Sequence, residues 1–193
     1  MWLRFALVSS IVTFPIHLYI LLATGLNPVT TPISALSRGD WGALHTLSLA
    51  SFGLAHLALA VGLTGMDRGR LWWLARMLLG AAGVGLVYLS YYFLSASAST
   101  LTAPGASAPL WVVASLTGTA MGALQPGLSR RARGLSIFSA ACLGIWLWLV
   151  PVFFFVGEDW TGAYERAVGL VYVIWLVCVS LGLSRVGEPQ APN

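Results

Sequence analysis

Charge is scarce in this chain, and lysine is absent altogether. Only 8% of the 193 residues are charged, and all ten of the strongly basic residues are arginines. Ordinary soluble domains carry about 25% charged residues, so the composition disfavours a soluble protein. Without lysine the chain can form neither a retinal Schiff base nor a Ser-Lys catalytic dyad.

Common catalytic signatures are missing as well. The sequence contains no GxSxG, no HExxH and no paired CxxC motif, which are the patterns of α/β-hydrolases, zinc metalloproteases and cysteine-based metal or redox sites. The motifs therefore assign no catalytic residue, no metal ligand and no cofactor. They leave open whether the protein is an enzyme and favour a non-catalytic role.

Apolar sequence, in contrast, is abundant. Hydrophobic residues make up 58% of the chain and the mean hydropathy is +0.84. Six apolar stretches are each close to the ~20 residues that a helix needs to cross a ~30 Å hydrocarbon core. They run from about Leu3 to Ala23, Gly42 to Leu63, Leu71 to Leu94, Pro109 to Leu124, Leu135 to Phe155 and Ala163 to Leu183.

The six stretches predict an all-α polytopic membrane protein, a bundle of six transmembrane helices. Residues 1–183 would form this single domain, and residues 184–193 a short cytoplasmic tail that we expect to be disordered. A secretory signal is the alternative for the first stretch, because Arg4 stands at its start and Leu22-Ala23-Thr24-Gly25 at its end offers small residues for cleavage. The apolar run is longer than a typical signal core, which favours a membrane span.

Arginines lie in alternating loops, and this pattern predicts the orientation. The N-terminus, the second and fourth loops and the tail hold Arg4, Arg68, Arg70, Arg130, Arg131, Arg133 and Arg185. Arg76, one turn into the third stretch, can reach the same side with its long side chain, and only Arg38 and Arg166 lie on the other side. The positive-inside rule then places both termini in the cytoplasm, in a multi-pass protein of the cytoplasmic (inner) membrane. Because the arginines flank the spans, the net charge of +4 indicates topology and not nucleic-acid binding.

Aromatic residues near the span ends agree with this orientation, since Trp and Tyr prefer membrane interfaces. The residues predicted at the inner interface are Trp2, Trp72 and Trp73, and those at the outer interface are Trp41, Tyr91, Tyr92, Trp111 and Trp160.

Small residues mark the expected helix contacts, because in lipid they allow backbones to approach closely. Gly118 and Gly122 form a GxxxG pattern in the fourth span, Gly80 and Gly83 lie in the third, and Gly144 lies in the fifth. We expect all five to pack within the bundle. A homodimer through the fourth span is the alternative.

Polar residues that could carry chemistry gather at the outer side. By helix rise, His17 and His45 should lie at similar depth in the first two spans. Near them the sequence places Ser34, Arg38 and Asp40 in the first loop, and Glu165 and Arg166 at the start of the last span. Ionisable residues inside spans are costly and suggest function, so a histidine pair near acids could bind a metal or relay protons.

Each of these residues also has a purely structural interpretation. His17 and His45 could each bond a loop carbonyl, and Arg38 and Arg166 could pair with nearby acids and clamp the first loop to the bundle. Asp40 could cap the second span. His56 lies about 16 Å deeper than His45, so we expect it to contact Ser or Thr side chains of the core.

The remaining sulfur and histidine chemistry is limited. Cys142 and Cys178 lie at similar depth in the last two spans. We expect inert thiols there, with a disulfide as the alternative. Three histidines permit at most one bis-histidine haem site, and only His17 and His45 lie at one level.

Three short segments resemble one known family. They are Pro32-Ile33-Ser34-Ala35-Leu36 in the first outer loop, Gly39-Asp40-Trp41-Gly42 at the second span, and Gly162-Ala163-Tyr164-Glu165-Arg166 at the sixth. The chain is similar, over nearly its whole length, to the prokaryotic membrane family catalogued as domain of unknown function 998. The resemblance implies a six-helix integral membrane fold and brings no reaction, substrate or catalytic residue.

Three functions remain open from the sequence. The favoured one is a non-catalytic membrane protein, either a lipid-binding bundle or an accessory subunit of a larger membrane assembly. Its expected partners are membrane lipids, together with a membrane-protein partner or a second copy of the chain. The first alternative is an outer-leaflet site that binds a metal or acts on a lipid head group, built on His17, His45, Asp40, Glu165 and Arg166. The second alternative is a small transporter.

Overall fold

The computed structural model describes residues 1–37, 40–64, 66, 69–95, 108–153 and 155–186. They form an all-α protein of six long helices. These are α1 (Trp2–Thr24), α2 (Gly42–Gly62), α3 (Arg70–Ser95), α5 (Ala108–Arg131), α6 (Arg133–Phe153) and α7 (Thr161–Val186). Two short 3₁₀ helices, η1 (Ile33–Ser37) and η2 (Glu158–Trp160), precede α2 and α7.

The all-α prediction is confirmed, and five of the six helices end within a few residues of the predicted bounds. The exception is α5, which continues from the predicted end at Leu124 to Arg131.

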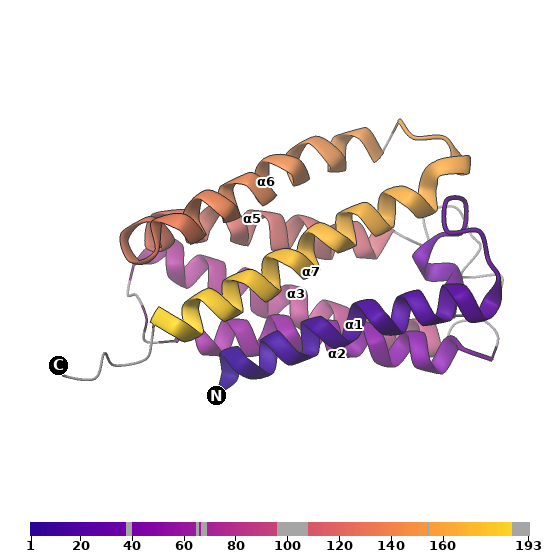
Figure 1. Ribbon diagram of the computed structural model, residues 1–193, viewed down its shortest axis with the longest axis horizontal. Coiled ribbons are helices and arrows are strands. Elements are labelled where there is room, and N and C mark those ends of the chain that lie inside the picture. The colour runs from indigo at the N-terminus through magenta and orange to yellow at the C-terminus, as the bar shows by residue number, and fades with distance from the viewer. Residues whose placement is uncertain (38–39, 65, 67–68, 96–107, 154, 187–193) are drawn as a thin grey trace.

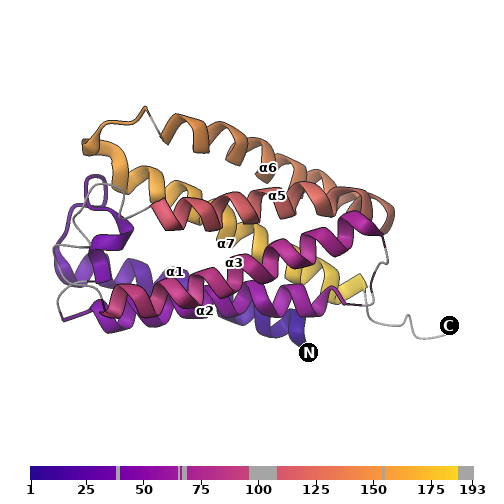
Figure 2. The same cartoon turned by 180° about the vertical axis from the view of Figure 1, so that it is seen from behind.

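The helices form a ring in chain order (Figures 1 and 2). Each packs against its neighbours in the sequence, and α1 closes the ring by packing against α7. Short connections make such neighbours antiparallel. With an even number of helices, the start of α1 and the end of α7 lie at the same end of the bundle, where Met1 and Trp2 line one surface hollow with Leu183 and Ser184.

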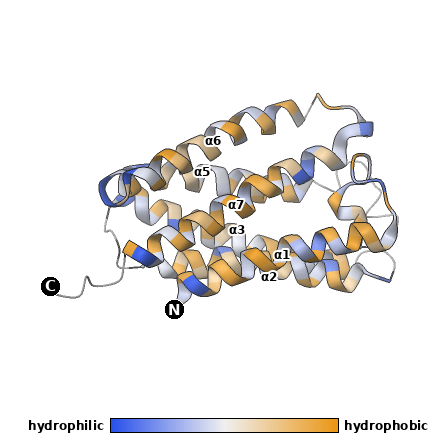
Figure 3. Ribbon diagram, viewed as in Figure 1, coloured by the Kyte–Doolittle hydropathy of each residue, from blue (hydrophilic) through white to orange (hydrophobic). Residues whose placement is uncertain are grey.

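Five helices are long and apolar enough to cross a membrane: α1, α2, α3, α6 and α7. The outer surfaces of these helices are apolar too, with Val8 59% and Trp148 64% exposed. Figure 3 shows hydrophobic residues along the helices and hydrophilic ones gathered toward the two ends of the bundle. So much exposed apolar surface is what a membrane protein presents to lipid. The sequence interval of α5 is more polar, with three hydroxyl side chains, Ser115, Thr117 and Thr119, near its middle.

Glycines allow close helix contacts at several points, which include some of the predicted positions but not every one. A Cβ on Gly83 would come within 2.8 Å of the Gly53 carbonyl oxygen on α2, and one on Gly118 within 2.6 Å of the Trp146 ring on α6. Gly122 has ordinary contact with Leu143. Around Gly80 and Gly144, however, no described atom lies within 4 Å of an added Cβ. The packing prediction is therefore wrong for these two, because their faces of α3 and α6 point away from neighbouring helices.

The core is built around large aromatic residues. Trp72 is 2% exposed, lies against Gly127 of α5, and donates a hydrogen bond from Nε1 to the Leu63 carbonyl oxygen at 3.1 Å. It is therefore a core residue and not the interface residue that the sequence suggested. Trp175, fully buried, donates from Nε1 to Ser139 Oγ at 2.8 Å. The two cysteines are free thiols.

Candidate functional site

A cavity of about 420 Å³ lies between α1, α2, α5 and α7, in the half of the bundle that adjoins η1. Most of its lining is apolar. The polar side chains that line it come from four helices: Thr13 and His17 of α1, His45, Ser48 and His56 of α2, Thr117 of α5, and Glu165, Arg166 and Tyr172 of α7. Four of the seven residues that the sequence placed in an outer-side cluster, His17, His45, Glu165 and Arg166, therefore line one cavity.

Arg166 connects α7 to the first loop. Its Nη1 donates to the carbonyl oxygens of Pro28 and Thr31, each at 2.7 Å, and to that of Gly162 at 2.8 Å. The guanidinium thus clamps the loop through backbone oxygens, and the carboxylate of Glu165, one of the acids that the sequence offered as its partner, interacts favourably with its charge. Nε and Nη2 of Arg166 are buried and make no hydrogen bond to any described residue.

Glu165 holds the same loop from the neighbouring position. Its side chain is 6% exposed, and Oε2 accepts a hydrogen bond from the Ile33 amide at 2.6 Å. The Ala163 amide donates to the Val29 carbonyl oxygen at 2.9 Å. Contacts from Ala163, Glu165 and Arg166, within about one turn of α7, thereby fix the loop over the start of this helix and close one end of the cavity.

The two outer histidines lie side by side. The ring centroids of His17 and His45 are 5.8 Å apart, with the planes tilted by 57°. His45 is 2% exposed. Both ring nitrogens of His45, and Nε2 of His17, are buried without a hydrogen-bond partner in the described part of the chain. Among the described residues, these atoms therefore do not make the bond to a loop carbonyl that a structural role would require.

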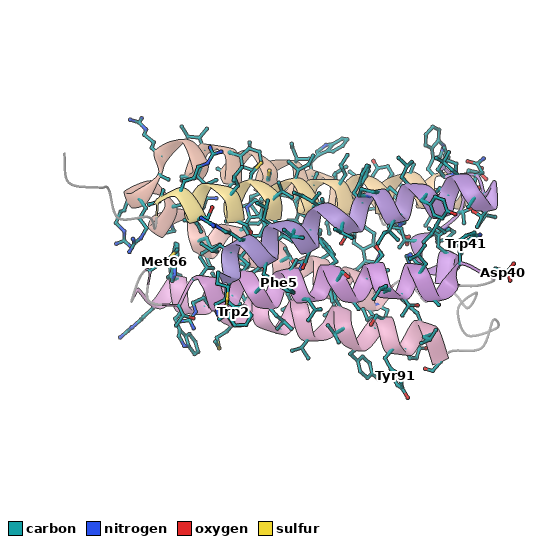
Figure 4. The ribbon with its side chains drawn as sticks, turned by 60° about the horizontal axis from the view of Figure 1, so that its bottom comes forward. Trp2, Phe5, Asp40, Trp41, Met66 and Tyr91 are labelled. Carbon is teal, nitrogen blue, oxygen red and sulfur yellow. The ribbon has the colours of Figure 1, made fainter. Side chains whose placement is uncertain are left out.

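Two described members of the predicted cluster, Ser34 and Asp40, do not line the cavity. Ser34 is buried in η1, and Arg38 lies outside the described residues. Asp40 is exposed at the end of the bundle, beside Trp41 (Figure 4). The N-cap of α2 is Trp41 and no side chain caps this helix, so the prediction that Asp40 caps it is wrong.

Among the described residues, the histidine pair has too few neighbouring ligands to form a metal site. Protein metal sites commonly use three or four His, Cys or carboxylate ligands. Within the described ranges, no group of three or more such residues could hold a metal ion. Glu165 directs one oxygen at the loop amide and Asp40 faces outward, so neither completes the pair.

Deeper in the cavity the polar groups are mutually satisfied. His56 Nδ1 lies 2.9 Å from the Phe52 carbonyl oxygen, and its Nε2 lies 3.2 Å from Thr117 Oγ1. Nδ1 must carry the proton to bond a carbonyl, which leaves Nε2 as an acceptor, and the single Thr117 hydroxyl proton is shared between this nitrogen and the Val113 carbonyl oxygen at 3.1 Å. The predicted contact of His56 with a core hydroxyl is confirmed. The Tyr172 hydroxyl donates to the Ala114 carbonyl oxygen.

Sequence reasoning missed Thr13, Ser48, Thr117 and Tyr172 as cavity residues. Each is an isolated polar residue in an apolar span, without a motif around it. The only available signal was helical phase. Tyr172 follows Glu165 by seven residues, two helical turns, and therefore lies on the same face of α7.

The cavity also reaches the outer surface of the bundle. Three of its lining residues are 40–46% exposed: Phe14 and Leu18 of α1 and Leu170 of α7. Since α1 and α7 pack side by side (Figure 1), the opening lies between these two helices. It faces sideways, toward the surface that the apolar helices would present to lipid.

Comparison with known families gives one match. The family described as "Protein of unknown function (DUF998)" matches residues 6–182. The chain belongs to this family. The DUF998 match runs from α1 to near the end of α7, so every residue that lines the cavity lies within it. No curated protein and no solved structure matches the chain significantly.

Proposed function

We propose that this DUF998 protein is a six-span protein of the cytoplasmic membrane that binds an amphiphilic lipid in the cavity between α1, α2, α5 and α7. The observation that carries the proposal is the lining of the cavity. Nitrogens of His17, His45 and Arg166 that bond no described residue lie at its loop end, and apolar side chains line the remainder, which opens sideways between α1 and α7.

The position of α5 supports its assignment as the sixth span. It packs lengthwise against α3 and against α6, both apolar enough to cross a membrane. Ser115 and Thr119 donate their hydroxyl protons to carbonyl oxygens one turn earlier, at 2.9 and 2.8 Å. Such back-bonding satisfies hydroxyls inside α5, which reduces the cost of placing them in lipid.

We expect both termini to face the cytoplasm, and accessible cysteines test this. In a background with Cys142→Ala and Cys178→Ala, Gly157→Cys should react with a membrane-impermeant maleimide on intact cells. Val186→Cys should react only after the membrane is permeabilised. Both positions are exposed, so a difference in labelling reports sidedness. Labelling of Val186→Cys from outside would overturn the orientation.

The shape of the cavity favours a lipid over a soluble ligand. A lipid has a polar head and an apolar chain, and the cavity has a polar loop end and an apolar remainder in the same order. The exposed rim of Phe14, Leu18 and Leu170 gives the apolar chain of the lipid a path from the bilayer into the cavity without crossing water. Pockets of roughly 300–1,000 Å³ bind small molecules, and 420 Å³ lies within that range.

Filling the cavity should remove the lipid. Gly169 lines it, and a Cβ at Gly169 meets no described atom within 4 Å, so Gly169→Phe has room to enter the cavity. We expect the amount of lipid that copurifies, measured by extraction and mass spectrometry, to fall at least about fivefold, the effect of losing roughly 1 kcal/mol of binding.

The matched control is Gly80→Phe. Gly80 is also a helical glycine with equal surroundings, but it lies on α3 away from the cavity. We expect this variant to keep its lipid. Equal lipid in wild type, Gly169→Phe and Gly80→Phe would show that the cavity does not hold it.

A further inference from the structure

We propose that the head group bound at the loop end of the cavity is an oxyanion, a phosphate or carboxylate held by Arg166 together with His45 and His17. This inference rests on the proposed binding of an amphiphile and adds the chemical class of its head group.

The Arg166 guanidinium has one edge, Nε and Nη2, that bonds no described residue and is available to a ligand. Nη1 is occupied by the three carbonyl oxygens of Pro28, Thr31 and Gly162, which fix the plane of the guanidinium. Nε and Nη2, the two nitrogens left without a described partner, form the side-on fork of an arginine. Their parallel N–H groups match the two oxygens of a carboxylate or phosphate. The clamp on the loop therefore orients the opposite edge for a ligand.

The histidines supply the second argument. His45 is 2% exposed, lines the cavity and has neither ring nitrogen bonded to a described residue. Nε2 of His17 is likewise unbonded, in a ring 5.8 Å away. A neutral imidazole carries one N–H donor. Two rings and one guanidinium edge thus present several donors to one region, and an oxyanion has enough oxygens to accept from all three residues.

Glu165 is the charged group that opposes an anion here. It lines the same cavity, and its Oε2 accepts from the Ile33 amide of the loop. A carboxylate beside Arg166 lowers the positive potential that an anion meets. Glu165→Gln removes the charge and keeps an oxygen that can accept from the Ile33 amide. An oxyanion should therefore bind more tightly to this variant, a change of opposite sign to that of the arginine and histidine variants.

The test compares two ligands that share a chain and differ in the head group. Purified full-length protein in phosphatidylcholine nanodiscs is mixed with equal concentrations of dodecyl phosphate and dodecanol, and the ligand retained after gel filtration is measured by mass spectrometry. We expect wild type to retain about ten times more dodecyl phosphate than dodecanol, as charge-assisted hydrogen bonds imply. Glu165→Gln should increase that ratio.

Two variants should lower the ratio toward one. Arg166→Lys keeps the charge and loses the fork. His45→Leu removes a ring that bonds no described residue, so it leaves no protein group newly unsatisfied and protects the test against a loss of folding. His45→Leu should still retain dodecanol, whereas Gly169→Phe should lose both ligands.

The outcomes separate the two proposals. If wild type retains the two ligands equally, the oxyanion is overturned while the amphiphile cavity stands. Retention of neither would overturn both. A third arm adds excess inorganic phosphate: complete displacement of dodecyl phosphate would identify a site for free phosphate and overturn a lipid head group, whereas continued retention supports the lipid.

Discussion

Replacement of Trp72 by alanine is expected to destabilise the protein by about 3–5 kcal/mol, the usual cost of truncating a buried tryptophan or phenylalanine. The indole is 2% exposed, and an added Cβ at Gly127 would overlap its ring, so the ring fills the space between α3 and α5 at the level of Gly127. The substitution also leaves the Leu63 carbonyl oxygen without the Nε1 donor. The measurement is the free energy of unfolding in mixed micelles titrated with sodium dodecyl sulfate.

The adjacent residue provides the matched control. Trp73 is 58% exposed on the outer face of the same helix. Its replacement by alanine should change the free energy of unfolding by no more than about 0.5 kcal/mol, as for other surface substitutions. A loss of similar size in both variants would show that Trp72 stabilises α3 through helix propensity or insertion, and not through its contact with Gly127.

Trp72 and Trp73 show what the sequence could predict about the fold and what it could not. Apolar runs of sufficient length identified the six helices because the requirement for buried backbone hydrogen bonds leaves few other structures in lipid. Which face of each helix points inward was not predictable in the same way. When every face of a helix is apolar, the hydrophobic pattern no longer distinguishes core from surface, so Trp72 and Trp73 appeared equivalent. The prediction that Gly80 and Gly144 pack against neighbouring helices was wrong for the same reason.

The candidate site was predictable where depth and residue type were informative. Helix rise placed His17 and His45 at one level, and charge at the start of the last span drew attention to Glu165 and Arg166. The partners of Arg166 were not predictable, because they are backbone carbonyl oxygens that any residue carries. Asp40 was misplaced by the assumption that an acidic residue before a helix caps it. Loop conformation, which the sequence does not encode in a motif, decided both cases.

Loop conformation also makes Gly162 a sensitive position near the site. A Cβ at Gly162 would clash with the Thr31 carbonyl oxygen, and would lie 2.7 Å from Arg166 Nη1 and 2.9 Å from the Pro28 carbonyl oxygen. Two of these three atoms are backbone oxygens that accept from Arg166. The clash therefore cannot be relieved without moving the loop that Arg166 and Glu165 hold.

We accordingly expect Gly162→Ala to destabilise the protein by about 1–3 kcal/mol, as overpacking does, and to release the loop that closes the cavity. Gly169→Ala on the same helix should instead be neutral or stabilise it by up to about 1 kcal/mol, because its Cβ meets no described atom and alanine favours the helix. Unfolding in mixed micelles measures the change in stability of both variants, and the amount of copurifying lipid measures the release of the loop in Gly162→Ala. Since both variants make the same chemical change in α7, opposite signs would reflect what surrounds each Cβ, which at Gly162 is the first loop and the Arg166 side chain that holds it. Equal stability in the two variants would mean that the loop does not bear on Gly162, and the oriented edge of Arg166 would lose its structural basis.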